Sequence, residues 1–130
     1  ELFELADAGR VADALRGARL VYLSGITLSL YSEIGLQRLF EALSGARAAG
    51  ARIAFDGNFR PRGWRGDLDR ARRVFAEVPP LADLALPTFD DEQALWGDAS
   101  AEETISRLIG YGIGEVAVKL GPGGAQVALG

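Results

Sequence analysis

The stretch RIAFDGNFRPRGW, residues 52–64, decides the fold of this chain. Its start, residues 52–55, is mostly apolar and short, which is typical of a buried strand. Polar residues follow at once, and open parallel α/β sheets bind their ligands at the carboxyl ends of their strands. Trp64 ends the stretch and is expected to pack as a lid rather than to stack on a ligand. The stretch therefore predicts a parallel sheet with a site at its carboxyl edge.

The residues after this strand have the chemistry of an anion site. Gly57 allows a sharp turn and a close approach of the backbone to a ligand, and Asn58 offers both donors and an acceptor. Arg60 and Arg62 carry forked guanidinium groups that suit phosphate or carboxylate, and Pro61 stiffens the loop between them. The alternative is a plain loop whose arginines pair with local carboxylates.

Composition limits the chemistry that this chain can perform. With 130 residues, 48% of them hydrophobic, the chain is expected to form one domain with a real core. A formal net charge of −4 argues against nucleic acid as a partner. The sequence has no Cys and no His, which excludes disulfides, thiol nucleophiles, imidazole bases and the commonest zinc sites. Chemistry must therefore depend on carboxylates, Lys, Arg, hydroxyls and backbone N–H groups.

The sequence gives no sign of a membrane or an export signal. No apolar run approaches the roughly 20 residues of a membrane span, and no signal peptide opens the chain. A cytoplasmic location without a membrane partner is therefore expected. The chain starts at Glu1, contains no Met, and stops at Gly130 directly after a strand-like run. We expect it to be an interior piece of a longer protein.

Strand-like and helix-like segments alternate along the rest of the chain. Strands are expected at residues 20–24, 52–55, 81–86, 115–120 and 125–129, with amphipathic helices between the first four. Ser32, Asp67 and Ser100 are suited to begin helices, because their side chains can accept hydrogen bonds from the N–H groups of a first turn. This alternation favours an α/β fold with a mostly parallel sheet.

Four strand exits are expected along one edge of that sheet. They are residues 24–27, 56–60, 88–92 and 119–124. In the first of them, residues 25–27 are expected to form a loop. Three of these exits carry clustered polar or glycine residues. Because the carboxyl ends of parallel strands share an edge, the clusters predict a single ligand site there.

The exit at 88–92 has two interpretations. Thr88 is a plausible helix N-cap, and acidic residues in a first turn are favoured by the helix dipole. The run Asp90, Asp91 and Glu92 holds more acids than capping requires. One of them could hold a hydrated Mg²⁺ through water.

The exit at 119–124, KLGPGG, is rich in glycine. Glycines after a strand let backbone N–H groups approach phosphates, as in anion-binding nests. The spacing is not that of a Walker loop. A plain turn between two strands is the alternative.

Together these stretches resemble the ribokinase-like (PfkB) family of sugar kinases. The matching segments are SGITLSL at 24–30, FDGNFRPRGW at 55–64, LPTFDDEQALWGD at 86–98 and VKLGPGGA at 118–125, in family order. They are most similar to members that phosphorylate 2-dehydro-3-deoxygluconate (KDG), although the D-x-N-x-R-x-x-x-W run is shared with fructokinase-like members. The resemblance implies a ribokinase-like, Rossmann-like three-layer sandwich with a mostly parallel sheet. Residues 1–130 would be the central part of that kinase domain, truncated at both ends.

The resemblance also implies which residues form the site. Arg60 and Asp56 would bind the substrate. The nucleotide would lie against Asn58, Phe59, Arg60, Lys119, Gly121, Pro122, Gly123 and Gly124. Glu92 matches the glutamate of the family's N-x-x-E motif, which organises Mg²⁺ and phosphates, although Phe89 stands where that motif has Asn. The catalytic aspartate of the family's G-A-G-D motif is expected after Gly130, so this segment by itself is expected to be inactive.

The implied activity is phosphorylation of KDG to its 6-phosphate by ATP with Mg²⁺. The implied partners are the small sugar acid and ATP, with a homo-oligomer for the full-length protein. One alternative is a fructokinase or ribokinase of the same family. Another is a phosphatase that uses Asp56 as nucleophile, although Asn58 stands where such enzymes usually have a second aspartate. A third is a non-catalytic, flavodoxin-like binding domain.

Overall fold

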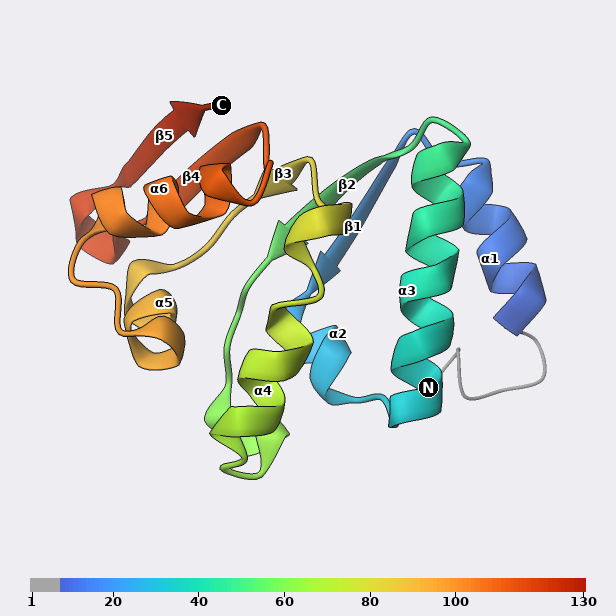
Figure 1. The fold of residues 1–130 in the computed structure, drawn as a ribbon, viewed down its shortest axis with the longest axis horizontal. Coiled ribbons are helices and arrows are strands. Elements are labelled where there is room, and N and C mark those ends of the chain that lie inside the picture. The colour runs from blue at the N-terminus through green and yellow to red at the C-terminus, as the bar shows by residue number, and fades with distance from the viewer. Residues whose placement is uncertain (1–7) are drawn as a thin grey trace.

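The computed structural model describes residues 8–130, which form a five-stranded sheet with helices packed on it (Figure 1). The helices are α1 (Ala8–Arg16), α2 (Gly25–Ser29), α3 (Glu33–Ala48), α4 (Leu68–Phe75), α5 (Phe89–Trp96) and α6 (Ala101–Gly110). The strands are β1 (Leu20–Ser24), β2 (Arg52–Asp56), β3 (Leu84–Ala85), β4 (Glu115–Lys119) and β5 (Ala125–Leu129). Short 3₁₀ turns are η2 (Pro61–Trp64), η3 (Pro79–Leu81) and η4 (Gly121–Gly123).

The strands lie in the sheet in sequence order, from β1 to β5. The first four strands are parallel, and β5 runs antiparallel to β4. The predicted α/β class with a mostly parallel sheet is confirmed. Among the helices of residues 8–130, none is both long and apolar enough to cross a membrane.

Three helices begin where the sequence predicted. The Ser32 hydroxyl accepts a hydrogen bond from the Gly35 N–H at the start of α3. Asp67 accepts one from the Arg70 N–H at the start of α4, and Ser100 caps α6 in the same way. Each of these caps satisfies an N–H group that has no partner inside its own helix.

Two expected segments differ from the structure. Residues 25–27 are not a loop but belong to α2, which begins directly after β1. The Ser24 hydroxyl lies 3.5 Å from the Thr27 N–H and caps this short helix. The expected strand at 81–86 is reduced to β3, because η3 occupies its beginning. Proline lacks an N–H group and favours such a turn over a strand.

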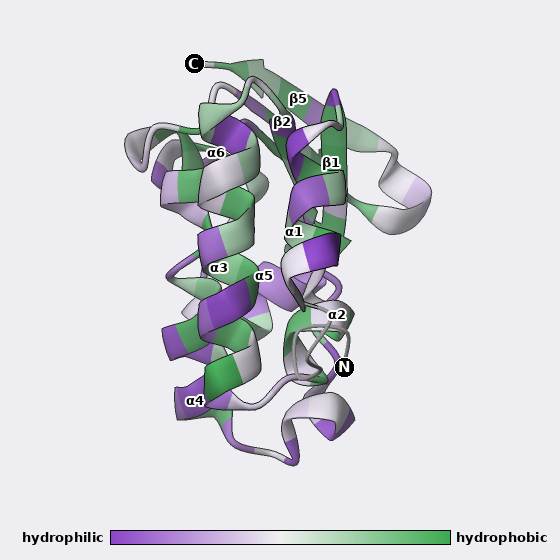
Figure 2. Cartoon of the chain, turned by 90° about the vertical axis from the view of Figure 1, so that its right-hand side faces the viewer, coloured by the Kyte–Doolittle hydropathy of each residue, from purple (hydrophilic) through white to green (hydrophobic). Residues whose placement is uncertain are grey.

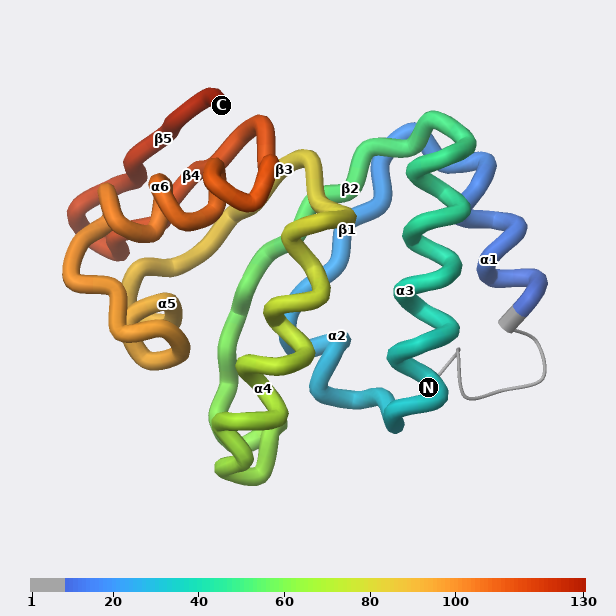
Figure 3. The backbone as a smooth tube through the Cα atoms, viewed as in Figure 1, coloured from blue at the N-terminus to red at the C-terminus, as the bar shows by residue number. Residues whose placement is uncertain are grey.

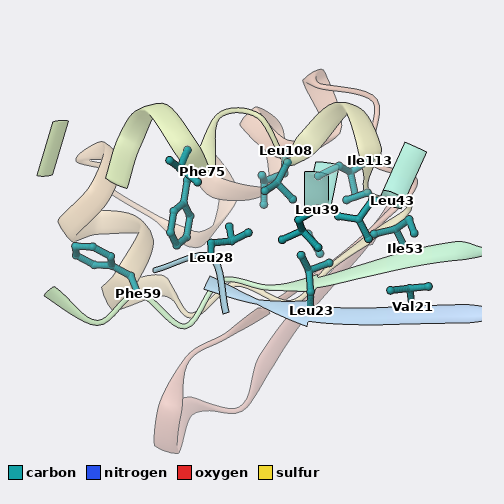
Figure 4. Packing of buried hydrophobic residues seen from close by; sticks show 14 of the residues in the cluster. Val21, Leu23, Leu28, Leu39, Leu43, Ile53, Phe59, Phe75, Leu108 and Ile113 are labelled. Atoms are coloured by element: carbon teal, nitrogen blue, oxygen red, sulfur yellow. The ribbon is translucent and has the colours of Figure 1, made fainter. Parts of the chain in front are cut away.

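The hydrophobic core lies between one face of the sheet and the helices. Leu23 and Ile53 point from β1 and β2 toward Leu39 and Leu43 of α3 (Figure 4). Val116 and Val118 of β4 share this face and are fully buried. Figure 2 shows α3, α4 and α6 on the same side of the strands.

The opposite face of the sheet is exposed within residues 8–130. The strand register places one row of residues across it: Tyr22, Ala54, Leu84, Glu115 and Leu129. Four large apolar side chains on this face are more than half exposed: Leu20 (57%), Tyr22 (56%), Val127 (69%) and Leu129 (76%). Because α1 packs on α3 instead, the described residues supply the sheet and one of the two helical layers expected in a three-layer sandwich (Figure 1).

Two glycines bring the ends of β1 and β2 together. A Cβ atom at Gly25 would lie 1.9 Å from the Gly57 carbonyl oxygen and 2.5 Å from Cζ of Phe75. Only glycine fits such a gap without a shift of the backbone. The tube in Figure 3 traces the chain from β2 into the long loop that leads to α4. This close approach fixes where the loop after β2 begins.

An aromatic cluster holds the far side of the same loop. The Phe75 ring of α4 meets the rings of Phe55, Phe59 and Trp64 edge to face, with centroids 5.6, 6.2 and 5.8 Å away. Trp64 is buried, and the Arg70 guanidinium lies 5.1 Å above its ring. The prediction that Trp64 packs rather than stacks on a ligand is confirmed.

Candidate active site

The strand exits meet at the carboxyl edge of the sheet, as the sequence predicted. Asp56 ends β2 and lies in register with Ser24 at the end of β1. Thr88 precedes α5 and forms a parallel bridge with Lys119 at the end of β4. Three polar exits from distant parts of the chain therefore line one short stretch of edge.

Asp56 lies at the centre of this edge with both of its oxygens engaged. The Lys119 ammonium donates to Oδ1 at 2.8 Å, and the Tyr22 hydroxyl donates to Oδ2 at 2.8 Å. The Asp56 side chain is 13% exposed, whereas that of Lys119 is 40% exposed. The hydrogen bond to Asp56, followed by burial and by the negative charge, raises the pKa of Tyr22.

This pairing changes what Asp56 offers to a ligand. A carboxylate held between Lys119 and Tyr22 is a poor free acceptor for a sugar hydroxyl and a poor nucleophile, which disfavours the phosphatase alternative. The sequence analysis missed both partners of Asp56. The alternation of side chains along a strand could have found Tyr22, because it lies on the same sheet face as Asp56.

The loop after β2 presents Arg60 at the edge. Asn58 has a positive φ of 37°, a conformation that asparagine tolerates better than most residues. Phe59 is buried and its N–H donates to Asp91 Oδ2 at 3.1 Å. The Arg60 side chain is 57% exposed, and its Nη1 donates to the Phe59 carbonyl at 3.0 Å. The Arg60 guanidinium is therefore anchored through one of its nitrogens, Nη1, while more than half of the side chain stays exposed.

The structure separates Phe59 from the other nucleotide candidates. Its ring packs into the core beside Phe75, so only its backbone faces the edge. Arg62, beyond Pro61, is exposed within η2. Of the two arginines in the loop, Arg60 is the one whose contacts direct it to the edge.

Glu92 lies inside a buried ion cluster. Its Oε2 pairs with Nη2 of Arg107 at 2.5 Å, and the same Nη2 lies 2.6 Å from Oδ2 of Asp98. The Thr104 hydroxyl donates to Asp98 at 2.7 Å, and the Arg107 guanidinium lies 5.4 Å from the centre of the Trp96 ring. Burial raises the pKa of Glu92, and the hydrogen bond from Arg107 opposes that rise.

These contacts bear on the expected magnesium role of Glu92. Its side chain is 6% exposed and already shares an oxygen with Arg107. Within residues 8–130, no group of three or more Asp, Glu, His or Cys side chains could hold a metal ion. A hydrated Mg²⁺ held through water by one carboxylate needs no such group, so the role of Glu92 stays a prediction.

The glycine-rich turn after β4 is exposed and closes on itself. The Gly123 N–H donates to the Leu120 carbonyl at 3.2 Å, and the Gly124 N–H donates to the Gly121 carbonyl at 3.1 Å. Gly121 and Gly124 have φ values of 61° and 87°, which favour glycine. The amides of Gly123 and Gly124, both expected to approach phosphate, thus serve the turn that joins β4 to the antiparallel β5, and Pro122 has no N–H group to offer. Phosphate binding by this turn stays a prediction.

The edge as a whole is suited to bind an anion. Asp56 and Asp91 each accept hydrogen bonds from the chain itself, and Glu92 is paired with Arg107. Arg60 and Lys119, by contrast, keep exposed surface. Asp90 is also exposed in the first turn of α5, so the cations that the edge offers to an anion are Arg60 and Lys119.

Comparison with known proteins identifies the family of this chain. The family described as pfkB family carbohydrate kinase matches residues 2–130. The 2-dehydro-3-deoxygluconokinase of Haemophilus influenzae is 40% identical over 119 residues, which is 92% of this chain and 38% of that protein.

Solved structures show the same fold. The PfkB protein of Polaromonas sp. JS666 superposes with a TM-score of 0.82 at 27% identity, over 91% of this chain and 40% of that one. A fructokinase of Vibrio cholerae O395, in its fructose, ADP and calcium ion bound form, superposes with a TM-score of 0.73 at 25% identity, over 85% of this chain and 35% of that one. The predicted ribokinase-like class is confirmed, and this chain spans less than half of each of these proteins. The chain belongs to the pfkB family of carbohydrate kinases.

Proposed function

We propose that residues 1–130 are the central part of a sugar kinase that uses ATP to convert KDG to its 6-phosphate. The observation that carries the proposal is the exposed guanidinium of Arg60, anchored at the carboxyl edge within a chain of the pfkB family. A relative named 2-dehydro-3-deoxygluconokinase at 40% identity supports the acidic substrate. We also propose that the protein works in the cytoplasm as a homo-oligomer, with neither nucleic acid nor membrane as a partner.

Phosphoryl transfer needs positioning and charge stabilisation more than covalent chemistry from the protein. Arg60 is proposed to serve both needs, because its fork can donate to the carboxylate of the sugar acid and to the transferring phosphoryl group. Its hydrogen bond to the Phe59 carbonyl limits how far the guanidinium can turn. Asn58 and the Gly121–Gly124 turn are proposed to lie on the nucleotide side of the same edge.

Lys119 is proposed to have a weaker part than Arg60. Its ammonium group is shared with Asp56, so only part of its charge is available to a phosphate. ATP is proposed to enter as its Mg²⁺ complex, and the ion pair with Arg107 argues against direct ligation of that metal by Glu92. No residue of this chain is proposed as the base that accepts the hydroxyl proton.

A fructokinase is the second candidate, favoured by the similarity to the Vibrio cholerae enzyme. The two functions differ in the charge of the sugar. A site that binds a carboxylate through a guanidinium should favour an acidic sugar over a neutral one, because only the acid accepts charge-assisted hydrogen bonds from the fork.

The experiment is to measure kcat/KM of the full-length protein with ATP and KDG, fructose or ribose as acceptor. We expect KDG to be preferred by at least about 100-fold. An equal or higher value for fructose or ribose would replace KDG as the substrate but keep the kinase. Absence of turnover with all three sugars, in a protein that binds ATP, would favour the non-catalytic alternative.

A further inference from the structure

One carboxylate of α5 touches the loop after β2 at two places. Oδ2 of Asp91 accepts a hydrogen bond from the Phe59 N–H at 3.1 Å and lies 3.6 Å from Nη1 of Arg60. The Asp91 side chain is 18% exposed, whereas that of Arg60 is 57% exposed. Asp91 is therefore the more buried partner, while more than half of the Arg60 side chain stays exposed.

The loop needs such a support because its backbone is unusual. Asn58 has a φ of 37°, and non-glycine residues hold this conformation only where their surroundings fix it. The next residue, Phe59, is fixed by its buried ring against Phe75 and by its N–H on Asp91. These two contacts determine the direction in which Arg60 leaves the loop.

We propose that Asp91 is a positioning residue that aims Arg60 at the anionic substrate, an inference that rests on the proposed kinase function. Asp91 acts through the Phe59 N–H, which sets the backbone, and through its charge, which lies near Nη1 of Arg60. Burial raises the pKa of Asp91, and the hydrogen bond from Phe59 and the charge of Arg60 oppose this rise.

A purely structural role for Asp91 is the competing explanation, since acids in a helix's first turn stabilise the helix through its dipole. Asp90 provides the matched control. It lies in the same first turn with the same charge but is exposed, so its loss should alter only the dipole interaction.

The test uses the full-length kinase with Asp91→Ala, Asp91→Asn and Asp90→Asn, each checked for folding by thermal melting. Asp91→Ala should lower kcat/KM for the sugar acid about 10- to 100-fold, because a displaced cation no longer meets its target. Asp91→Asn keeps an acceptor for the Phe59 N–H and should recover part of this loss. Asp90→Asn should stay within about twofold of the wild type, since it keeps every loop contact of Asp91.

A double-mutant cycle with Arg60→Ala separates positioning from general stability. If Asp91 acts through Arg60, adding Asp91→Ala to Arg60→Ala should lower kcat/KM by less than about threefold further. The proposal would be overturned if the fold-losses in kcat/KM of the two single variants multiplied in full in the double variant. It would also be overturned if the Asp91→Ala enzyme were as active as the Asp90→Asn enzyme. A wild type without kinase activity would refute the proposed function and this inference together, whereas an active wild type with multiplying losses would refute the inference alone.

Discussion

Arg60 and Arg62 lie two residues apart in one loop, yet their settings differ. Arg60 is anchored to the Phe59 carbonyl and lies near Asp91, whereas Arg62 is exposed within η2. Arg60→Ala in the full-length kinase should lower kcat/KM about 10²–10³-fold, as for the loss of one transition-state donor. Arg60→Lys should recover only part of it, because the ammonium lacks the fork.

Arg62→Ala is the control for this prediction, with folding compared by circular dichroism. We expect it to change kcat/KM little, as a rim charge. A crippled Arg62→Ala beside a nearly normal Arg60→Ala would mean that the loop directs the other arginine to the substrate. If neither variant matters, residues 56–64 are a structural turn.

Gly25 is the residue whose small size is most strictly required. A Cβ there would lie 1.9 Å from the Gly57 carbonyl oxygen, so Gly25→Ala must move the backbone of α2 or of the loop after β2. We expect the variant to lower the free energy of unfolding by about 1–3 kcal/mol, as overpacking does. It should also lower kcat, because Gly57 leads directly into the Arg60 loop.

Gly110→Ala is the matched control for Gly25→Ala, because a Cβ at Gly110 would meet nothing within 4 Å. Denaturant unfolding of both full-length variants gives the comparison. Equal free energies of unfolding for the two variants would show that the backbone around Gly25 can move to admit a Cβ atom without a loss of stability.

Between elements, the ion cluster of Arg107 joins α5 to α6. Arg107 meets two buried carboxylates, Glu92 and Asp98, whose side chains are 6% and 8% exposed. Arg107→Met would leave both without their cation, and such a loss should cost about 3–5 kcal/mol of unfolding free energy. Because Glu92 is in the first turn of α5, the variant should also disturb the neighbouring Asp91.

The control for Arg107→Met is Arg52→Met, which breaks a pair with Glu115 on the exposed sheet face. That pair has an N–O distance of 2.8 Å, but its side chains are 56% and 44% exposed. Loss of this pair should lower the free energy of unfolding by about 0–1 kcal/mol. Equal losses in the two variants, measured by urea unfolding, would contradict a role for burial in the Arg107 cluster.

At the scale of the whole molecule, one face of the sheet carries large apolar side chains that are exposed within residues 8–130. Leu20, Tyr22, Val127 and Leu129 lie on it, each more than half exposed. Exposed patches of this kind bind apolar dyes and promote association. The 130-residue chain alone should therefore bind the dye anilinonaphthalene sulfonate.

The full-length protein should bind this dye much less per molecule, if the rest of the kinase covers the face. Titration of both proteins at equal concentration makes the comparison. Replacing Val127 and Leu129 with lysine should reduce dye binding by the chain. Equal binding by both proteins would place the exposed face at the surface of the complete kinase.

The sequence by itself determined the elements, because the signals for them are local. Ser32, Asp67 and Ser100 cap helices through N–H groups three residues away. Clusters of polar residues after buried strands were enough to predict the edge at which three of the strand exits meet. The exceptions, at 25–27 and in the strand expected at 81–86, are places where a serine cap and two prolines favoured short helical turns.

Only the tertiary structure decided which of the polar residues are accessible. Lys119 reaches Asp56 across 63 positions of sequence, and Phe59 reaches Asp91 across 32. The sequence shows Asp56, Glu92 and Lys119 as equally available charges, since it does not record which charges lie side by side. Burying an unpaired charge costs free energy, so the buried carboxylates are paired with nearby cations and N–H groups. Arg60 stayed accessible because its contacts with Phe59 and Asp91 use one guanidinium nitrogen, Nη1, and leave 57% of the side chain exposed.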